Sequence, residues 1–199
     1  MADQIAPRAS GGFGVADAAA ALQTRTIVVG LGNPVLGDDG VGWRVADEVE
    51  GRLRAVRDAG GAVPAVEVER LGVGGLRLME SLAGYDAAIL VDAADFPDRP
   101  LGEVRSCALD DLDCYAAGHL DSAHDASLVT ALALGRRLGA SLPTRIQTVT
   151  VQVQRTDIFS ERLTPEVEAA VPAAASAVVE LLMDTPATPD QRGSEEGAQ

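Results

Sequence analysis

Residues 27–42, I-V-V-G-L-G-N-P-V-L-G-D-D-G-V-G, place the tightest constraint on how this chain can fold. A β-branched run leads into a turn of glycine, asparagine and proline, and two acids, Asp38 and Asp39, stand where a helical pattern begins. This order of strand, glycine turn, carboxylates and helix is typical of the carboxyl edge of an open α/β sheet, where sites are built. The function of the chain therefore depends on what the two acids do.

Strand and helix patterns alternate along most of the chain. Short apolar or alternating runs predict strands at Thr26–Leu31, Val66–Arg70, Ala87–Val91 and Ile146–Val153, with an edge strand at Gly102–Leu109. Helical spacing predicts four helices. The first ends near Gly60–Gly61 and has Val41, Val45, Val49, Leu53 and Val56 on one face, and a short one follows at Leu76–Leu82. The third starts near His124 with Leu128, Leu132 and Leu138 on one face, and the last, at Thr164–Met183, has a proline in its first turn. The alternation predicts an α/β fold, a three-layer α/β/α sandwich with a twisted, mainly parallel sheet of about five strands.

Length and composition indicate one domain with a short segment at each end. We expect a flexible, Ala- and Gly-rich leader at 1–24, a single α/β domain at 25–183 and a polar, disordered tail at 184–199. No apolar run reaches the ~18 residues of a membrane span, and the N-terminus lacks the pattern of a secretory signal. Two cysteines are too few for a disulfide framework, so Cys107 is predicted to be a small core residue, and Cys114 has no metal-binding spacing. These features predict a cytoplasmic protein.

The chain is strongly acidic. The net charge is −14, and all 16 basic residues are arginine. An acidic surface without a basic stripe argues against a nucleic-acid partner. The same surface would tolerate a cationic metal or a basic peptide.

Asp39, Asp92 and His124 are the candidate site residues. Asp92 closes the apolar run of the third predicted strand, and His124, like His119, falls just before a predicted helix. A parallel sheet can bring these positions to one rim. Two carboxylates and one imidazole form an open three-ligand set suited to zinc or another divalent ion, which can polarise a carbonyl or generate a bound hydroxide. Each acid could instead be a cap or turn former; one acid suffices to cap the helix, and we assign that role to Asp38.

A nucleotide-binding turn fits the sequence poorly. Gly30 and Gly32 match the first two positions of G-x-G-x-x-G, but Val35 occupies the third. The second strand ends near Arg70 rather than an acid, which could at most suit a 2′-phosphate. No Gly-Lys-Ser/Thr follows the turn, which excludes a P-loop.

The segment G-L-G-N-P-V-L-G-D-D-G-V-G resembles the N-terminal signature of hydrogenase maturation proteases, endopeptidases that trim the C-terminus of nickel-iron hydrogenase large subunits. Three further segments resemble the family in its order: A-A-I-L-V-D-A with Asp92, S-A-H-D-A-S-L with His124, and R-L-T-P-E-V at the last helix. The resemblance spans roughly residues 26–183. It implies that Asp39, Asp92 and His124 are metal ligands and the catalytic residues. It also implies that the nickel already inserted in the large-subunit precursor is recognised before a C-terminal peptide is removed.

Two segments depart from the family pattern. Arg70-Leu71-Gly72 stands where an acidic-glycine pair is common, and Val151–Arg155 lacks the proline of a G-x-Q-P-like stretch. Both are expected in loops that contact the substrate. Peptidyl-tRNA hydrolases also begin with a strand and G-L-G-N-P, but a His-Asn pair follows soon after, whereas the next histidine here is His119. Two other functions stay open: a non-catalytic binding module for the precursor or a nucleotide, and a generic divalent-metal hydrolase.

Overall fold

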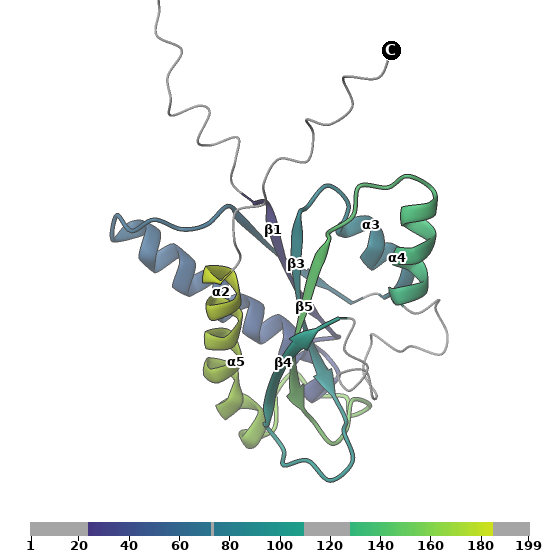
Figure 1. Ribbon diagram of the computed structural model, residues 1–199. Helices are drawn as coiled ribbons and strands as arrows, with labels where there is room; N and C mark the ends of the chain where they lie inside the picture. Colours follow the sequence, from purple (N-terminus) through teal and green to yellow (C-terminus); the bar gives the residue numbers. More distant parts are fainter. Residues whose placement is uncertain (1–23, 73, 110–127, 185–199) are drawn as a thin grey trace, which may run out of the picture.

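The computed structural model describes residues 24–72, 74–109 and 128–184, which form an α/β fold around one five-stranded sheet (Figure 1). The strands are β1 (Thr26–Leu31), β2 (Val66–Leu71), β3 (Ala87–Ala94), β4 (Val104–Ala108) and β5 (Arg145–Gln152). Their order across the sheet is β2-β1-β3-β5-β4. All neighbours pair in parallel except β4, which runs antiparallel to β5 at the edge. The predicted mainly parallel sheet, with its edge strand, is confirmed.

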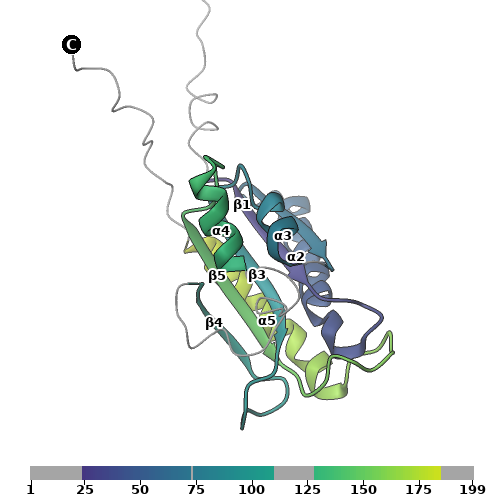
Figure 2. The ribbon, with the colours of Figure 1, turned by 90° about the vertical axis from the view of Figure 1, so that its right-hand side faces the viewer.

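Helices cover both faces of the sheet (Figures 1 and 2). The helices are α2 (Val41–Asp58) and α5 (Pro165–Met183) on one face, and α3 (Gly75–Ser81) and α4 (Leu128–Arg137) on the other. Alternate residues of β1 serve the two layers: Val28 packs with α2 and α5, whereas Ile27 and Val29 pack with α3 and α4. Because β1 is buried on both faces, its sequence is a continuous apolar run. The three-layer sandwich is confirmed.

The predicted helices are present within the described residues, but the prediction is wrong at two apolar residues. Val56 is 45% exposed near the end of α2, and Leu138 is 77% exposed beyond the last residue of α4. The end of α2 near Gly60 and Gly61 is as predicted. Gly60 has φ +78°, and the Gly61 N–H donates to the carbonyl of Val56 (2.9 Å), which is the Schellman arrangement that terminates helices. The backbone carbonyl of Val56 thus takes part in ending the helix, while its side chain stays partly exposed.

Some predictions fall outside the described residues. The leader 1–24 and the tail 184–199 lie outside them except for one residue each, and so does the predicted start of a helix near His124.

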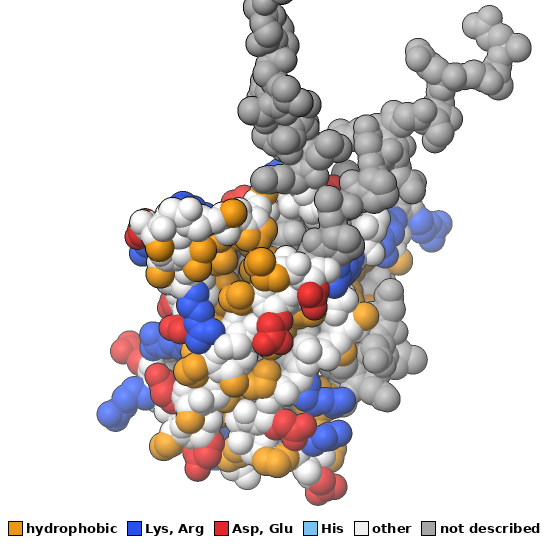
Figure 3. Space-filling model, turned by 60° about the vertical axis from the view of Figure 1, so that its left-hand side comes forward, with side chains coloured by type: hydrophobic (Ala, Val, Ile, Leu, Met, Phe, Trp, Pro, Cys, Tyr) orange, Lys and Arg blue, Asp and Glu red, His pale blue; other side chains and the backbone are white. Residues whose placement is uncertain are grey.

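On the face formed by α2 and α5, acidic and basic side chains are interspersed among apolar ones (Figure 3). Within the described ranges, no helix combines the length and apolar character needed to cross a membrane.

Candidate functional site

The glycine turn after β1 brings the two acids back against the strand. Gly32 has φ +121°, and a Cβ there would lie 1.8 Å from the carbonyl oxygen of Asp39, so only glycine fits. The next residue, Asn33, accepts a hydrogen bond from the Val35 N–H through Oδ1 (3.2 Å) and from the Leu36 N–H through its carbonyl (3.0 Å). These bonds form a tight Asx-type turn, as the Gly-Asn pair predicts.

The acids themselves lie in a 3-10 turn, η1 (Gly37–Gly40), that runs into α2. Asp39 is 2% exposed, and its Oδ2 accepts a hydrogen bond from the Asn33 N–H at 2.7 Å. The carboxylate of Asp39 is therefore oriented by the glycine turn itself. Burying a carboxylate is costly unless hydrogen bonds or a cation stabilise it, so this position is suited to a cation ligand as well as to a structural acid.

Asp38 does not have the predicted role. The prediction made it the cap of its own helix, but neither η1 nor α2 has a side-chain cap. Asp38 is 6% exposed and instead binds Thr164, at the N-cap of α5. Its Oδ1 accepts from the Thr164 N–H at 2.7 Å, and its Oδ2 accepts from the Thr164 hydroxyl at 2.9 Å. Asp38 thus joins two sequence segments, D-D and L-T-P, across 126 residues of the chain.

Asp92 lies inside β3 rather than at its end. The prediction closed this strand at Asp92, but β3 continues to Ala94 because it stays paired with β5, where Asp92 lies opposite Thr150. On its other side, the pairing of β3 with β1 ends at Val91, directly before Asp92. Asp92 is 1% exposed. Its position is thus the first one at which β3 is no longer flanked by β1.

The elements that carry Asp39 and Asp92 touch one another. The turn η1 contacts β3, and a Cβ on Gly42, in the first turn of α2, would lie 2.5 Å from the carbonyl oxygen of Val91. This close approach places the start of α2 over the ends of β1 and β3. The sheet topology therefore brings the two predicted carboxylates to the same edge, as the sequence suggested.

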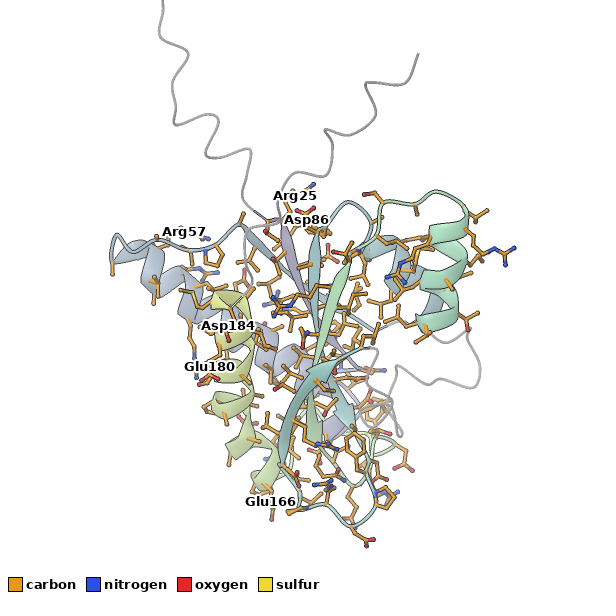
Figure 4. All side chains as sticks on the ribbon, viewed as in Figure 1. Arg25, Arg57, Asp86, Glu166, Glu180 and Asp184 are labelled. Carbon is orange, nitrogen blue, oxygen red and sulfur yellow. The ribbon has the colours of Figure 1, made fainter. Side chains whose placement is uncertain are left out.

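Figure 4 gives the orientation of this edge. Arg25 and Asp86 precede β1 and β3, and they mark the amino edge of the sheet. Glu166, in the first turn of α5, lies at the opposite end of the molecule, which is the carboxyl edge. The candidate carboxylates belong to that carboxyl edge, where open α/β sheets place their sites.

The third predicted ligand, His124, lies outside the described residues, as does His119. Among residues 24–72, 74–109 and 128–184, no group of three His, Cys, Asp or Glu side chains is arranged to hold a metal ion. The described part of the chain thus supplies two carboxylates, and a three-ligand site of the predicted kind would need a further residue. The set of three stays a prediction.

Gln152 is a residue of this edge to which the sequence analysis gave no role, although it lies in the stretch Val151–Arg155 that departs from the family pattern. It is 4% exposed at the end of β5, and its Oε1 accepts from the Phe96 N–H at 3.0 Å. Its Nε2 donates to the carbonyl of Val153 (2.9 Å) and to Oδ1 of Asp95 (3.3 Å). Gln152 thereby fixes the backbone that follows Asp92. The sequence signals were its place in that stretch and a polar residue that continues the strand alternation.

The two segments that depart from the family pattern are not simple loops. Arg70 lies in β2 and binds Asp47 (2.7 Å) and Glu50 (2.6 Å), both on α2. Val151 lies in β5 and is fully buried. Arg70 and Val151 therefore lie in strands, whereas Gly72 and residues 153–155 follow the ends of β2 and β5. Contact of these segments with the substrate stays a prediction. Because two carboxylates already neutralise its guanidinium, Arg70 is poorly placed to bind a nucleotide phosphate.

The cysteine prediction is also corrected. Cys107 is half-buried on β4, with its Sγ 3.1 Å from the Thr148 hydroxyl, and it is disulfide-bonded rather than a free core thiol. Cys114 lies outside the described residues. The spacing between Cys107 and Cys114 in the sequence did not indicate that Cys107 forms a disulfide.

Comparisons with known proteins agree with this architecture. A sequence model of the family described as hydrogenase maturation protease matches residues 25–181. The structure is similar to the hydrogenase-maturating endopeptidase HybD from E. coli, with 23% identity, a TM-score of 0.62, and coverage of 80% of this chain and 92% of that one. It is also similar to a hydrogenase 2 maturation peptidase from a Thaumarchaeota archaeon (27%, 0.52, 79% and 97%) and to the [NiFe] hydrogenase maturation protease HycI from Thermococcus kodakarensis (22%, 0.56, 86% and 100%). Comparison with curated protein sequences finds no match.

Proposed function

Because the chain belongs to the hydrogenase maturation protease family, and is therefore an endopeptidase of hydrogenase maturation, we propose that it processes the large-subunit precursor of a nickel-iron hydrogenase after nickel insertion. The reaction is the removal of a C-terminal peptide from that precursor. The observation that carries the proposal is the pair of buried carboxylates, Asp39 and Asp92, on two elements that touch at the carboxyl edge of the sheet.

In this proposal, Asp39 and Asp92, together with His124, bind the nickel that the precursor brings. Two carboxylates and an imidazole are a ligand set that borderline divalent ions accept. The Asn33 N–H holds one oxygen of Asp39, so the orientation of this carboxylate is set before the substrate arrives. The nickel belongs to the substrate; zinc or another divalent ion at the same ligands would give a general hydrolase instead.

The proposal can be tested with purified precursor in nickel-loaded and nickel-free forms. We expect the chain to shorten only the loaded form, with the cut detected by mass spectrometry. Asp39→Asn and Asp92→Asn should each abolish processing, because an amide oxygen is a weaker metal ligand than a carboxylate and carries no charge. Asp184→Asn, at the exposed end of α5, is the matched control and should process normally.

Two results would count against the proposal. Equal cleavage of the two precursor forms would show that nickel is not recognised, and no cleavage of the loaded form would exclude the reaction. If the wild-type chain retained the precursor without shortening it, and Asp39→Asn did the same, a binding module would be the better description.

A further inference from the structure

The connection between β5 and α5, residues 153–164, exposes two large apolar side chains. Phe159 is 81% exposed and Ile158 is 46% exposed. The other phenylalanine in the described ranges, Phe96, is 7% exposed, as is usual for this residue type in a core. Aromatic side chains such as phenylalanine are enriched at protein interfaces relative to the rest of the surface. We call Ile158 and Phe159 the apolar tip.

The backbone next to the apolar tip is firmly held. The Ser160 N–H donates to the carbonyl of Val35 (3.0 Å), and the Ser160 carbonyl accepts from the Gly37 N–H (2.6 Å). The Ser160 hydroxyl accepts from the Arg162 N–H at 3.0 Å. Farther along, Thr164 is bound by Asp38, as described above. The exposure of the apolar tip is therefore a property of a fixed segment.

These bonds also tie the apolar tip to the candidate site. Ser160 is bonded to Gly37, which lies two residues before Asp39, so the Cα atoms of Phe159 and Asp39 are at most about 17 Å apart by chain geometry. A standard interface buries roughly 800 Å² on each partner, which corresponds to a patch about 16 Å in radius. An interface of standard size that is centred on Asp39 would thus reach to about the position of the apolar tip.

We propose that Ile158 and Phe159 form a docking surface for the hydrogenase precursor, and that an apolar segment of the precursor near its cleaved region occupies it. This inference rests on the proposed function, because the precursor is the macromolecule that must cover the edge with Asp39. The apolar tip contributes to binding and leaves the chemical step to the carboxylates. Removing it should weaken capture of the precursor without slowing cleavage of precursor that is bound.

The test compares the double variant Ile158→Ser, Phe159→Ser with the control Leu138→Ser. Leu138 is 77% exposed and lies on the connection from α4 to β5, at the amino edge of the sheet, so the control removes a large exposed apolar side chain far from the site. For the double variant we expect KM for nickel-loaded precursor to rise about tenfold or more, with kcat within twofold of wild type. The control should match wild type in both constants.

Each other result would overturn the inference. An unchanged KM would show that the precursor does not dock there, and an equal rise in the control would show that only total apolar surface matters. A wild-type dimer that becomes a monomer in the double variant, at constant KM, would identify a second copy of the chain as the occupant. Binding of the intact precursor, measured by biolayer interferometry, separates this inference from the proposed function, because it does not require cleavage.

Discussion

Replacing Thr164 with valine isolates the bond between the start of α5 and Asp38. The two residues have nearly the same shape, so the change removes the hydroxyl that donates to Oδ2 of Asp38 (2.9 Å) and leaves the Thr164 N–H bond to Oδ1 (2.7 Å) intact. Thr164 occupies the N-cap of α5 but makes no side-chain capping bond there. The substitution therefore tests the contact with Asp38 without the usual loss of a helix cap.

The expected loss of stability follows from the burial of the acceptor. A hydrogen bond to a charged group contributes about 1.5–3 kcal/mol, and its loss leaves the Asp38 oxygen, on a side chain 6% exposed, without that donor. Because Thr164 itself is exposed, water can replace part of the bond, so we expect about 1–2 kcal/mol for Thr164→Val. Thr164→Ser keeps the hydroxyl and should stay within about 0.5 kcal/mol of wild type.

The free energy of unfolding, measured by urea denaturation at neutral pH, decides the point. We expect the valine variant to unfold at lower urea with an unchanged m-value, since the surface exposed on unfolding is the same. If valine and serine at position 164 were equally stable, the idea that the bond from the Thr164 hydroxyl to Asp38 stabilises the fold would be refuted.

Two further predictions concern the backbone and the charge network. Gly32→Ala should destabilise the fold by about 3 kcal/mol or more, because the new Cβ would lie 1.8 Å from the Asp39 carbonyl oxygen and φ at this position is +121°. The control Gly51→Ala lies in α2, where a Cβ would have no atom within 4 Å, and it should stabilise the fold slightly. Thermal unfolding of the two variants checks this, and similar melting temperatures would contradict it. The hydrogen bond and charge of Arg70 lower the pKa of Glu50 below its usual 4.5, so the bridge stabilises the fold above that value and is lost as the pH falls below it. Arg70→Ala should therefore lower the free energy of unfolding by up to about 1 kcal/mol at pH 7, since these side chains are partly exposed and solvent-screened, and by less at pH 3. A difference in unfolding free energy between wild type and variant that widened on acidification would contradict this.

Local patterns in the sequence were sufficient to predict the fold. The β-branched run of β1 is buried on both faces, and the Gly-Gly pair after α2 terminates that helix, as expected from backbone preferences alone. The length of β3 was less predictable. It extends past Asp92 because its partner β5 continues alongside it, and a single strand carries no record of its neighbour's length.

The candidate site was predictable in its location but not in its bonds. A strand followed by glycine, asparagine and two acids indicates the carboxyl edge of a sheet, and the structure places Asp39 and Asp92 on touching elements there. The partner of Asp38 could not be predicted, because Thr164 is 126 residues away and helical periodicity says nothing about which distant group an acid meets. The role of Gln152 was missed for the same reason, because two of its partners, Asp95 and Phe96, follow β3 and meet it only through the packing of β3 beside β5.

The two adjacent acids differ in role because of the turn that carries them. In a 3-10 turn, successive side chains point about 120° apart, so two neighbouring residues cannot face the same partner. In η1 this directs Asp39 to the Asn33 N–H and Asp38 to Thr164. The turn is thus fixed on one side by β1 and on the other by α5, and Asp39 lies between these two attachments. In the proposed function, a carboxylate ligand at the position of Asp39 is held by the fold, so it need not be ordered when the substrate binds. On this reasoning, loss of the Asp38 contact should reduce the affinity for precursor, although Asp38 is not one of the proposed metal ligands.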